Sequence, residues 1–224
     1  MRLTRLIAGT VTAGLLSLVP IALTAPAAQA SVTTNLQVQS SYKMLTYGME
    51  TSLRAAVTAT DSTGYTGAVR VGSVQLQSKV TGKAWKTIKT ATASSYVSFG
   101  QIKPKEHTEY RISYSGGTDT YGNVFRAGVS TPVKVKVKRK ITFPRKGLTL
   151  KGKVSPQFKK KKLVVKVSKK ETKGFKKYRT IKTNKKGRYS LKLPRRRGTF
   201  FYKVIVPKDK RFLSSSYTWR TYGY

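Results

Sequence analysis

Val133-Lys134-Val135-Lys136-Val137 is the stretch of sequence that decides the fold. Valine alternates with lysine, and a period of two places the valines on one side of an extended chain and the lysines on the other. Two stretches in the second half of the chain repeat this alternation, Thr149-Leu150-Lys151-Gly152-Lys153-Val154 and Tyr189-Ser190-Leu191-Lys192-Leu193. Helical periodicity is scarce from residue 31 onward, and Gly, Pro, Ser and Lys clusters divide short apolar runs. The pattern predicts an all-β protein of half-buried strands.

The strand pattern occurs twice along the chain. Trp85-Lys86-Thr87-Ile88-Lys89-Thr90 matches Tyr178-Arg179-Thr180-Ile181-Lys182-Thr183 at an offset of 93 residues (178 − 85). The same offset sets Tyr96 on Tyr189. Each copy holds about seven short strand candidates in roughly a hundred residues, which is the size of a β-sandwich. We therefore expect two copies of one sandwich module.

The first copy resembles a known family. Gly82-Lys83-Ala84-Trp85-Lys86-Thr87-Ile88-Lys89-Thr90, then Tyr110-Arg111-Ile112-Ser113-Tyr114-Ser115-Gly116, then an alternating Val-Lys strand, are similar to bacterial immunoglobulin-like modules of secreted actinobacterial proteins. The second copy is a looser match, with Tyr178 where the family has Trp. The resemblance implies two tandem immunoglobulin-like antiparallel β-sandwiches that act as spacers or binding modules on exported proteins. In such sandwiches Tyr110 and Tyr202 are expected to make a corner hydrogen bond.

The first thirty residues have the composition of a secretory signal. Arg2 and Arg5 precede an apolar stretch from Leu6 to Leu23, and Ala28-Gln29-Ala30 is a small-x-small cleavage pattern. Cleavage is the prediction and an uncleaved membrane anchor is the alternative, while no later segment has the ~18 apolar residues of a membrane helix. The mature chain is expected to be secreted, extracellular or loosely associated with the cell surface. The predicted boundaries are 1–30 for the signal peptide, 31–137 for module one and 138–224 for a strongly basic module two.

Charge separates the two modules. Lys and Arg outnumber Asp and Glu by 46 to 7 over the whole chain. Residues 31–137 carry 13 basic and 5 acidic side chains, whereas residues 138–224 carry 31 and 2, a balance of +29. Cys is absent, so each module depends on its apolar core without a disulfide. Mutual repulsion in the second module opposes folding, which favours an anionic partner.

The sequence offers few groups for catalysis. His107 is the only histidine, and with Glu106 and Glu109 it could form a triad or a metal site, although a solvated turn is the simpler interpretation. The remaining carboxylates are scattered singly: Glu50, Asp61, Asp119, Glu171 and Asp209. We therefore predict no catalytic residue, no metal, no cofactor and no enzymatic activity. An enzyme with an unrecognised site, tested by His107→Ala, stays as a third hypothesis after the two below.

Runs of basic residues occur where turns or strand ends are expected. Arginine grips phosphate, sulfate or carboxylate with two hydrogen bonds, and lysine acts as a point charge. Because the loops of a sandwich cluster at its two ends, several runs could converge. The predicted polyanion-binding residues are Lys138, Arg139, Lys140, Lys159, Lys160, Lys161, Lys162, Lys185, Lys186, Arg195, Arg196, Arg197, Lys208, Lys210 and Arg211.

Two functions are consistent with these runs. The first is a non-catalytic binding module whose second domain attaches, without sequence specificity, to a cell-wall polymer, an anionic lipid surface or extracellular nucleic acid. The alternative is a structural or adhesive surface protein with a protein partner, in which the lysines only maintain solubility. Trp219, Tyr222 and Tyr224 are then candidate contact residues. The oligomeric state is left open by both.

Overall fold

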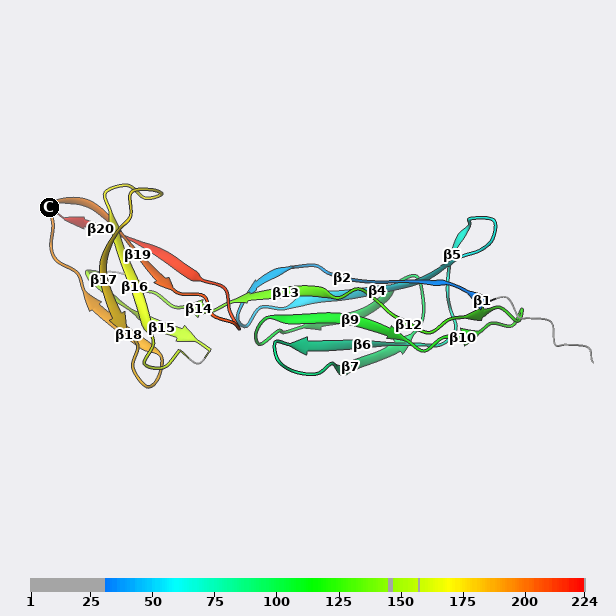
Figure 1. The fold of residues 1–224 in the computed structure, drawn as a ribbon. Helices are drawn as coiled ribbons and strands as arrows, with labels where there is room; N and C mark the ends of the chain where they lie inside the picture. Colours follow the sequence, from blue (N-terminus) through cyan, green and yellow to red (C-terminus); the bar gives the residue numbers. More distant parts are fainter. Residues whose placement is uncertain (1–30, 145–146, 157, 224) are drawn as a thin grey trace, which may run out of the picture.

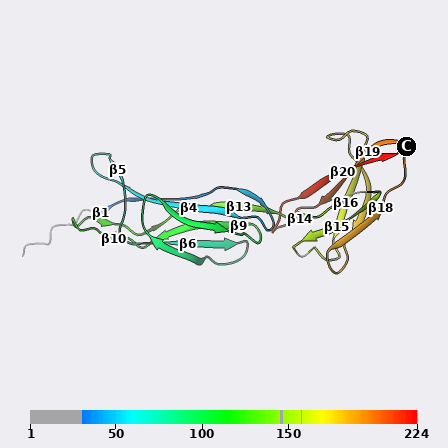
Figure 2. The same ribbon diagram turned by 180° about the vertical axis from the view of Figure 1, so that it is seen from behind.

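The computed structural model describes residues 31–144, 147–156 and 158–223, and in them the chain forms two all-β modules that lie end to end (Figures 1 and 2). The predicted signal peptide and Tyr224 lie outside the described residues. None of the described segments forms a helix with the length and hydropathy needed to span a membrane.

The first module is a sandwich of two sheets with a small extension. One sheet contains β2 (Thr34–Ser40), β4 (Thr51–Thr60), β5 (Thr66–Ala68) and β8 (Val97–Ile102). The other contains β3 (Met44–Thr46), β13 (Val133–Lys138), β9 (Thr108–Tyr114), β6 (Ser73–Val80) and β7 (Lys86–Thr92), with β12 (Gly128–Val129) beside β9. The extension contains β1 (Ser31–Val32), β11 (Val124–Phe125) and β10 (Gly117–Thr118).

The second module repeats the arrangement with fewer strands. One sheet contains β14 (Lys140–Ile141), β15 (Thr149–Ser155) and β18 (Arg188–Lys192). The other contains β17 (Lys176–Lys182), β16 (Lys162–Ser168), β19 (Gly198–Val206) and β20 (Ser215–Gly223).

The strand pairing is that of immunoglobulin-like sandwiches. In both modules the first, second and fifth main strands form one sheet, and the third, fourth, sixth and seventh form the other. Pairing is antiparallel apart from β3 with β13 and β1 with β11, which are parallel. The predicted fold class, two tandem β-sandwiches, is confirmed.

Each module has its own apolar core between its sheets, as the alternating pattern predicts. Leu53, Leu76 and Ile112 are fully buried in the first core, and Leu150 and Leu163 are fully buried in the second. Burial of such side chains contributes roughly 2 kcal/mol each to folding, and no disulfide supplements it. Two tandem cores therefore stabilise two separate modules.

Two sequence predictions are wrong, one about the alignment of the two copies and one about a hydrogen bond. Tyr96 is 59% exposed and precedes β8, whereas its predicted counterpart Tyr189 is 4% exposed within β18. Tyr202 makes no corner hydrogen bond, since its buried Oη has no hydrogen-bond partner among the described residues. Instead, the Tyr189 hydroxyl donates to the Thr142 carbonyl at 2.8 Å.

Candidate functional site

Several predicted basic residues meet at the end of the second module that faces the first. The Lys160 N–H donates to the Asn184 carbonyl at 3.3 Å, and the Lys161 N–H donates to Thr183 Oγ1 at 3.1 Å. These bonds join the β16 entry loop to the β17–β18 turn, in which Asn184 Oδ1 accepts from the Lys186 N–H at 2.8 Å. We call the exposed lysines of this region the proximal cluster: Lys159, Lys160, Lys161, Lys162, Lys182, Lys185, Lys186 and Lys208.

Part of the proximal cluster surrounds one pocket. The pocket has a volume of about 490 Å³, and four of its lining lysines are neighbours of Phe158 and Pro207: Lys160, Lys161, Lys162 and Lys208. Lys182, which the sequence prediction did not include, also lines it. Arg139 and Asp209, which pair with each other, complete the lining. A lining of several lysines with two apolar rings suits an anionic group attached to a less polar chain.

Lys160 has an unusual backbone conformation within this cluster. Its φ is +52°, and it is the non-glycine residue with a positive φ among the described residues. This region costs an ordinary residue roughly 1 kcal/mol, whereas glycine enters it freely. The folded backbone conformation at this position is therefore less favourable for lysine than it would be for glycine.

The three arginines of the predicted set lie elsewhere. Arg195, Arg196 and Arg197 are exposed in the loop between β18 and β19, at the end of β18 opposite to the β17–β18 turn. They line a second pocket, of about 340 Å³, together with Leu148 and Tyr222. The predicted cations therefore do not form one patch, because these arginines lie apart from the proximal cluster.

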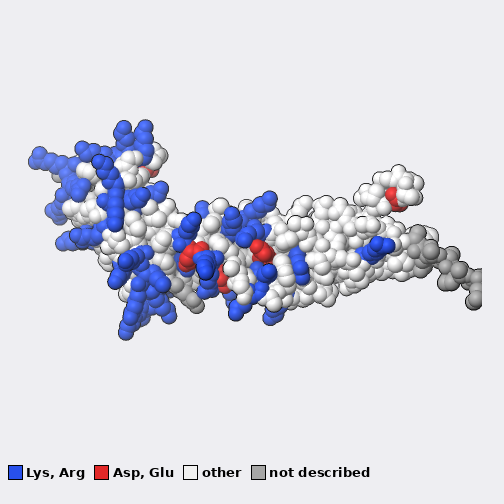
Figure 3. Space-filling view, viewed as in Figure 1, with Lys and Arg blue, Asp and Glu red and all other residues white. Residues whose placement is uncertain are grey.

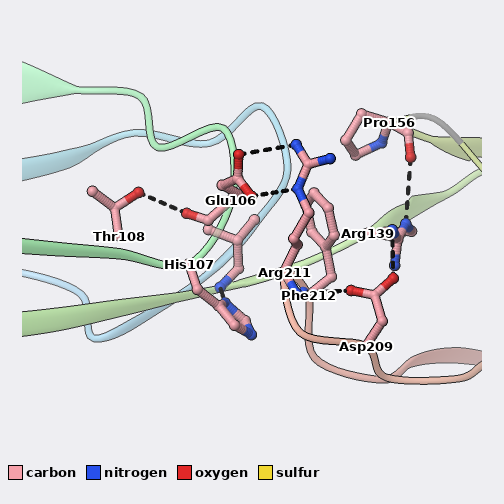
Figure 4. Close-up of polar contacts among 9 residues, drawn as sticks. Glu106, His107, Thr108, Arg139, Pro156, Asp209, Arg211 and Phe212 are labelled. Carbon is pink, nitrogen blue, oxygen red and sulfur yellow. Dashed lines mark hydrogen bonds and ion pairs between the residues drawn. The ribbon is translucent and has the colours of Figure 1, made fainter. Parts of the chain in front are cut away.

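The other predicted residues surround the junction between the modules. Lys138 ends β13, Lys140 begins β14, and Lys210 and Arg211 belong to the β19–β20 turn. Only Arg139 lies between the last strand of one module and the first strand of the next. Figure 4 shows the contacts of this region.

Arg139 is not a surface cation, which corrects its assignment as a polyanion-binding residue. It is 6% exposed, and its Nη2 lies 2.8 Å from Asp209 Oδ2. Its guanidinium also lies 4.0 Å from the Phe212 ring centroid and 5.1 Å from that of Phe158. Burial alone would raise the pKa of Asp209, but the Arg211 N–H and the Arg139 guanidinium outweigh burial and lower it. Arg139 therefore has a structural role at the junction.

A second ion pair joins the two modules directly. The Arg211 guanidinium donates to both carboxylate oxygens of Glu106, with Nη2 2.9 Å from Oε1 (Figure 4). The His107 N–H donates to the Arg211 carbonyl at 3.0 Å, and the Leu213 N–H donates to the Val137 carbonyl at 2.9 Å. The modules are thus connected by backbone bonds as well as by charge, and Arg211 is partly occupied by this contact.

His107 has a structural role at the same junction. Its Nδ1 accepts a hydrogen bond from the Val137 N–H at 2.9 Å, which requires the nitrogen to be unprotonated. Burial lowers the pKa of His107 below its usual 6.5, and the charge of Lys134 and Lys136 lowers it further, against the opposing effect of Asp209 and Glu106. The histidine is therefore neutral near pH 7.

This contact predicts a pH effect on stability. The unfolded chain binds a proton to His107 at a higher pH than the folded chain, so the stabilisation is complete above pH 6.5 and decreases as the pH falls below it. His107→Asn keeps an acceptor at this position but cannot titrate. Thermal unfolding from pH 7.5 to 5 should show a smaller decline in melting temperature for H107N than for the native chain. Parallel profiles would exclude His107 as the titrating group.

Four further acidic side chains also have structural partners. Asp61 Oδ1 accepts from the N–H groups of Thr63 and Tyr65, and Asp119 Oδ1 accepts from those of Tyr121 and Asn123. Hydrogen bonds from Thr63 and Asn123, respectively, lower the pKa of these two turn carboxyls. Glu50 pairs with Lys103, and Glu109 pairs with Lys134. Over the described part of the chain, no three His, Asp or Glu side chains group as metal ligands.

Sequence reasoning expects lysines on the exposed strand faces but does not show which of them lie side by side. Across the sheets of the second module, Lys153 lies directly opposite Arg188, Lys162 opposite Lys182, and Lys166 opposite both Lys177 and Lys203. Alternation in each strand predicts that these side chains point outward, but it does not predict which strand pairs with which. Only the pairing register brings them together.

The aromatic side chains of β20 mostly have contacts within the protein. Trp219 is half-buried and its Nε1 donates to the Gly147 carbonyl at 3.2 Å. Tyr222 is 61% exposed, with the Arg220 guanidinium 4.3 Å from its ring centroid. Tyr222 is thus the more accessible of the two predicted contact residues that the structure describes.

Comparisons with known proteins add little to this geometry. No protein-family model matches the chain, and no curated protein matches it. A solved structure titled "Marsupial T cell receptor" aligns with 10% sequence identity and a TM-score of 0.34, over 85% of this chain. The chain spans 62% of the length of that structure.

Proposed function

We propose that this chain is a secreted, non-catalytic binding protein of the actinobacterial immunoglobulin-like type that it resembles, and that it attaches through its second module to an anionic polymer. Cell-wall polymer, anionic lipid surface and extracellular nucleic acid are the candidate partners. The first module then acts as a spacer that precedes the basic module in the chain.

The supporting observation is the scarcity of neutralising charge on the second module. Residues 138–224 contain two acidic side chains, and one of them, Asp209, is paired with the buried Arg139. Glu171 is then the remaining acid among exposed lysines and arginines, which crowd this module in Figure 3 while the far part of the first module is mostly uncharged. Such a surface repels itself and attracts polyanions. The costly backbone conformation of Lys160 also fits a lysine retained for its charge.

Salt dependence of binding tests this proposal. The chain without residues 1–30 is titrated with teichoic acid, duplex DNA and vesicles of phosphatidylglycerol at several salt concentrations, with neutral dextran as a blank. Release of counterions from four phosphates should weaken binding about 100-fold between 50 and 200 mM salt. Binding that does not change with salt would exclude electrostatic attachment.

A pair of matched variants locates the attachment. Replacing Lys159, Lys160, Lys161 and Lys162 with Gln removes four charges from the second module. Replacing the exposed Lys43, Lys83, Lys86 and Lys105 with Gln removes four from the first module. The first variant should bind at least tenfold more weakly with a shallower salt slope, and the second should change little. Equal losses would contradict the assignment to the second module.

A further inference from the structure

The outer face of the four-stranded sheet in the second module carries a row of lysines in direct register. Lys177 of β17 is paired with Lys166 of β16, and Lys166 is paired in turn with Lys203 of β19. The next position in the row is Thr218 of β20. We call Lys177, Lys166 and Lys203 the lysine row. Neighbouring strands lie about 4.8 Å apart, so the three lysine side chains leave the backbone within about 10 Å of one another across the sheet.

Such a row is unfavourable in the free protein. Like charges directly opposite each other on neighbouring strands repel and destabilise a sheet. In the part of the chain that the structure describes, no carboxylate forms an ion pair with any of the three, because Asp209 pairs with Arg139 and Glu171 has no ion pair. A ligand carrying several negative charges removes this repulsion when it binds, so the row favours an anionic chain over a single anion.

The same face has a second lysine pair and a neutral strip between the two. Lys162 lies opposite Lys182 at the other end of β16. Val164 lies between the pair and the row on β16. It is paired with Thr180 of β17 on one side and with Ile205 of β19 on the other. Cations on both sides of an aliphatic and hydroxyl strip fit a polymer whose charged groups alternate with uncharged carbon segments.

The row consists of lysine alone. Lysine binds phosphate as a point charge with rotatable donors, and it does not impose the fixed two-bond geometry with which arginine binds phosphate or carboxylate. Successive exposed aromatic rings, which single-stranded nucleic acid binders use to stack bases, are missing from the described part of this face. Phe201 is 7% exposed with the Arg220 guanidinium 5.7 Å from its ring, and Phe175 is half-buried with Lys203 Nζ 5.5 Å from its ring.

We propose that the lysine row, with Lys162 and Lys182 beside it, is a binding face for a linear polyol phosphate, a phosphodiester chain without bases that lies on this face of the sheet. This inference rests on the proposed function and deepens it by naming the face and the class of polymer. The other lysines of the proximal cluster and the loop of Arg195, Arg196 and Arg197 then add affinity at the ends of the module without defining the polymer.

A triple variant of the row tests the face. Lys166, Lys177 and Lys203 are replaced with Gln, and the matched control replaces Lys159, Lys185 and Lys186 of the proximal loops, which removes the same charge. Affinity for a purified poly(glycerol phosphate) should fall at least tenfold for the row variant, and its salt slope should become shallower by about 2. The control should lose clearly less affinity than the row variant. Greater loss in the control than in the row variant would overturn the choice of face.

Unfolding without ligand provides an independent readout. Because the row variant removes like-charge repulsion, its melting temperature at low salt should be higher than that of the native chain, and the gap should narrow as salt increases. A variant that is more stable yet binds less well cannot have lost affinity through misfolding. A lower melting temperature would show that the lysines stabilise the sheet and would overturn the proposal.

Competing polymers test the class of ligand. Single-stranded DNA, polyuronate and phosphatidylglycerol vesicles are compared with poly(glycerol phosphate) at equal concentrations of negative charge. Tighter binding of any of them would overturn the polyol phosphate as ligand while leaving polyanion attachment intact. Failure of the native chain to bind every one of these polymers would instead contradict the proposed function itself.

Discussion

Replacing Asp209 with Asn is expected to lower the stability of the second module by about 2–3 kcal/mol. The substitution leaves the guanidinium of Arg139, which is 6% exposed, without a carboxylate partner. Removing one member of a buried ion pair typically costs about 3–5 kcal/mol, and we reduce this because the Asp209 side chain is 46% exposed. The carbonyl of Pro156, 3.3 Å from Arg139 Nε, would stay as a partner but cannot neutralise the charge.

Thermal and denaturant unfolding of full-length protein measure this effect. A loss of this size corresponds to a decrease of about 10 °C in the melting temperature of a module of this length. Glu171→Gln is the matched control, because it removes the other acid of the same module, which forms no ion pair within the described residues. Equal decreases in D209N and E171Q would mean that overall charge, and not the Arg139 contact, controls stability.

Gly152→Ala is expected to cost about 3 kcal/mol through a steric conflict. A Cβ at Gly152 would lie 1.8 Å from the carbonyl oxygen of Thr142 and 2.7 Å from Tyr189 Oη. The Thr142 segment cannot move away freely, because its N–H donates to the Lys153 carbonyl at 2.9 Å and its carbonyl accepts from Tyr189. Inserting a methyl group against fixed backbone forces the strands apart.

Denaturant midpoints check this prediction against a second glycine in a strand. At Gly67 of β5 the nearest atom to an added Cβ is in the Tyr65 ring at 3.4 Å, which is an ordinary contact. Gly67→Ala should therefore change the midpoint little, whereas Gly152→Ala should lower it clearly. If both variants unfold at the native midpoint, β14 and its following segment pack less closely than the structure indicates.

Local alternation predicted the strands but not their partners. The Val-Lys alternation of residues 133–137 became β13, with Val135 and Val137 buried. Such a pattern sets which side chains face inward, because the period is a property of one strand. Pairing register is non-local, so the pairing of Lys166 with both Lys177 and Lys203 could not be found from sequence.

The junction shows why basic runs could not be assigned fully from sequence. Lys138, Arg139 and Lys140 are adjacent and equally basic in the sequence, yet only Arg139 is buried. Its burial depends on Asp209, which lies seventy residues later (209 − 139). The loops around Lys159–Lys162 and Lys185–Lys186 were correctly expected at strand ends, since turn residues surround them.

The parallel pairing of β3 with β13 has a mechanical consequence. The chain enters the first module at its far end and leaves it through β13 toward the second, so opposite pulls on the two ends slide these strands past each other (Figure 1). The bonds from the Lys136 N–H to the Lys43 carbonyl and from the Tyr47 N–H to the Lys138 carbonyl, each 2.8 Å, then bear the load together. A tethered molecule stretched along its length is therefore held in shear, and the first module must break these bonds at once before it can extend.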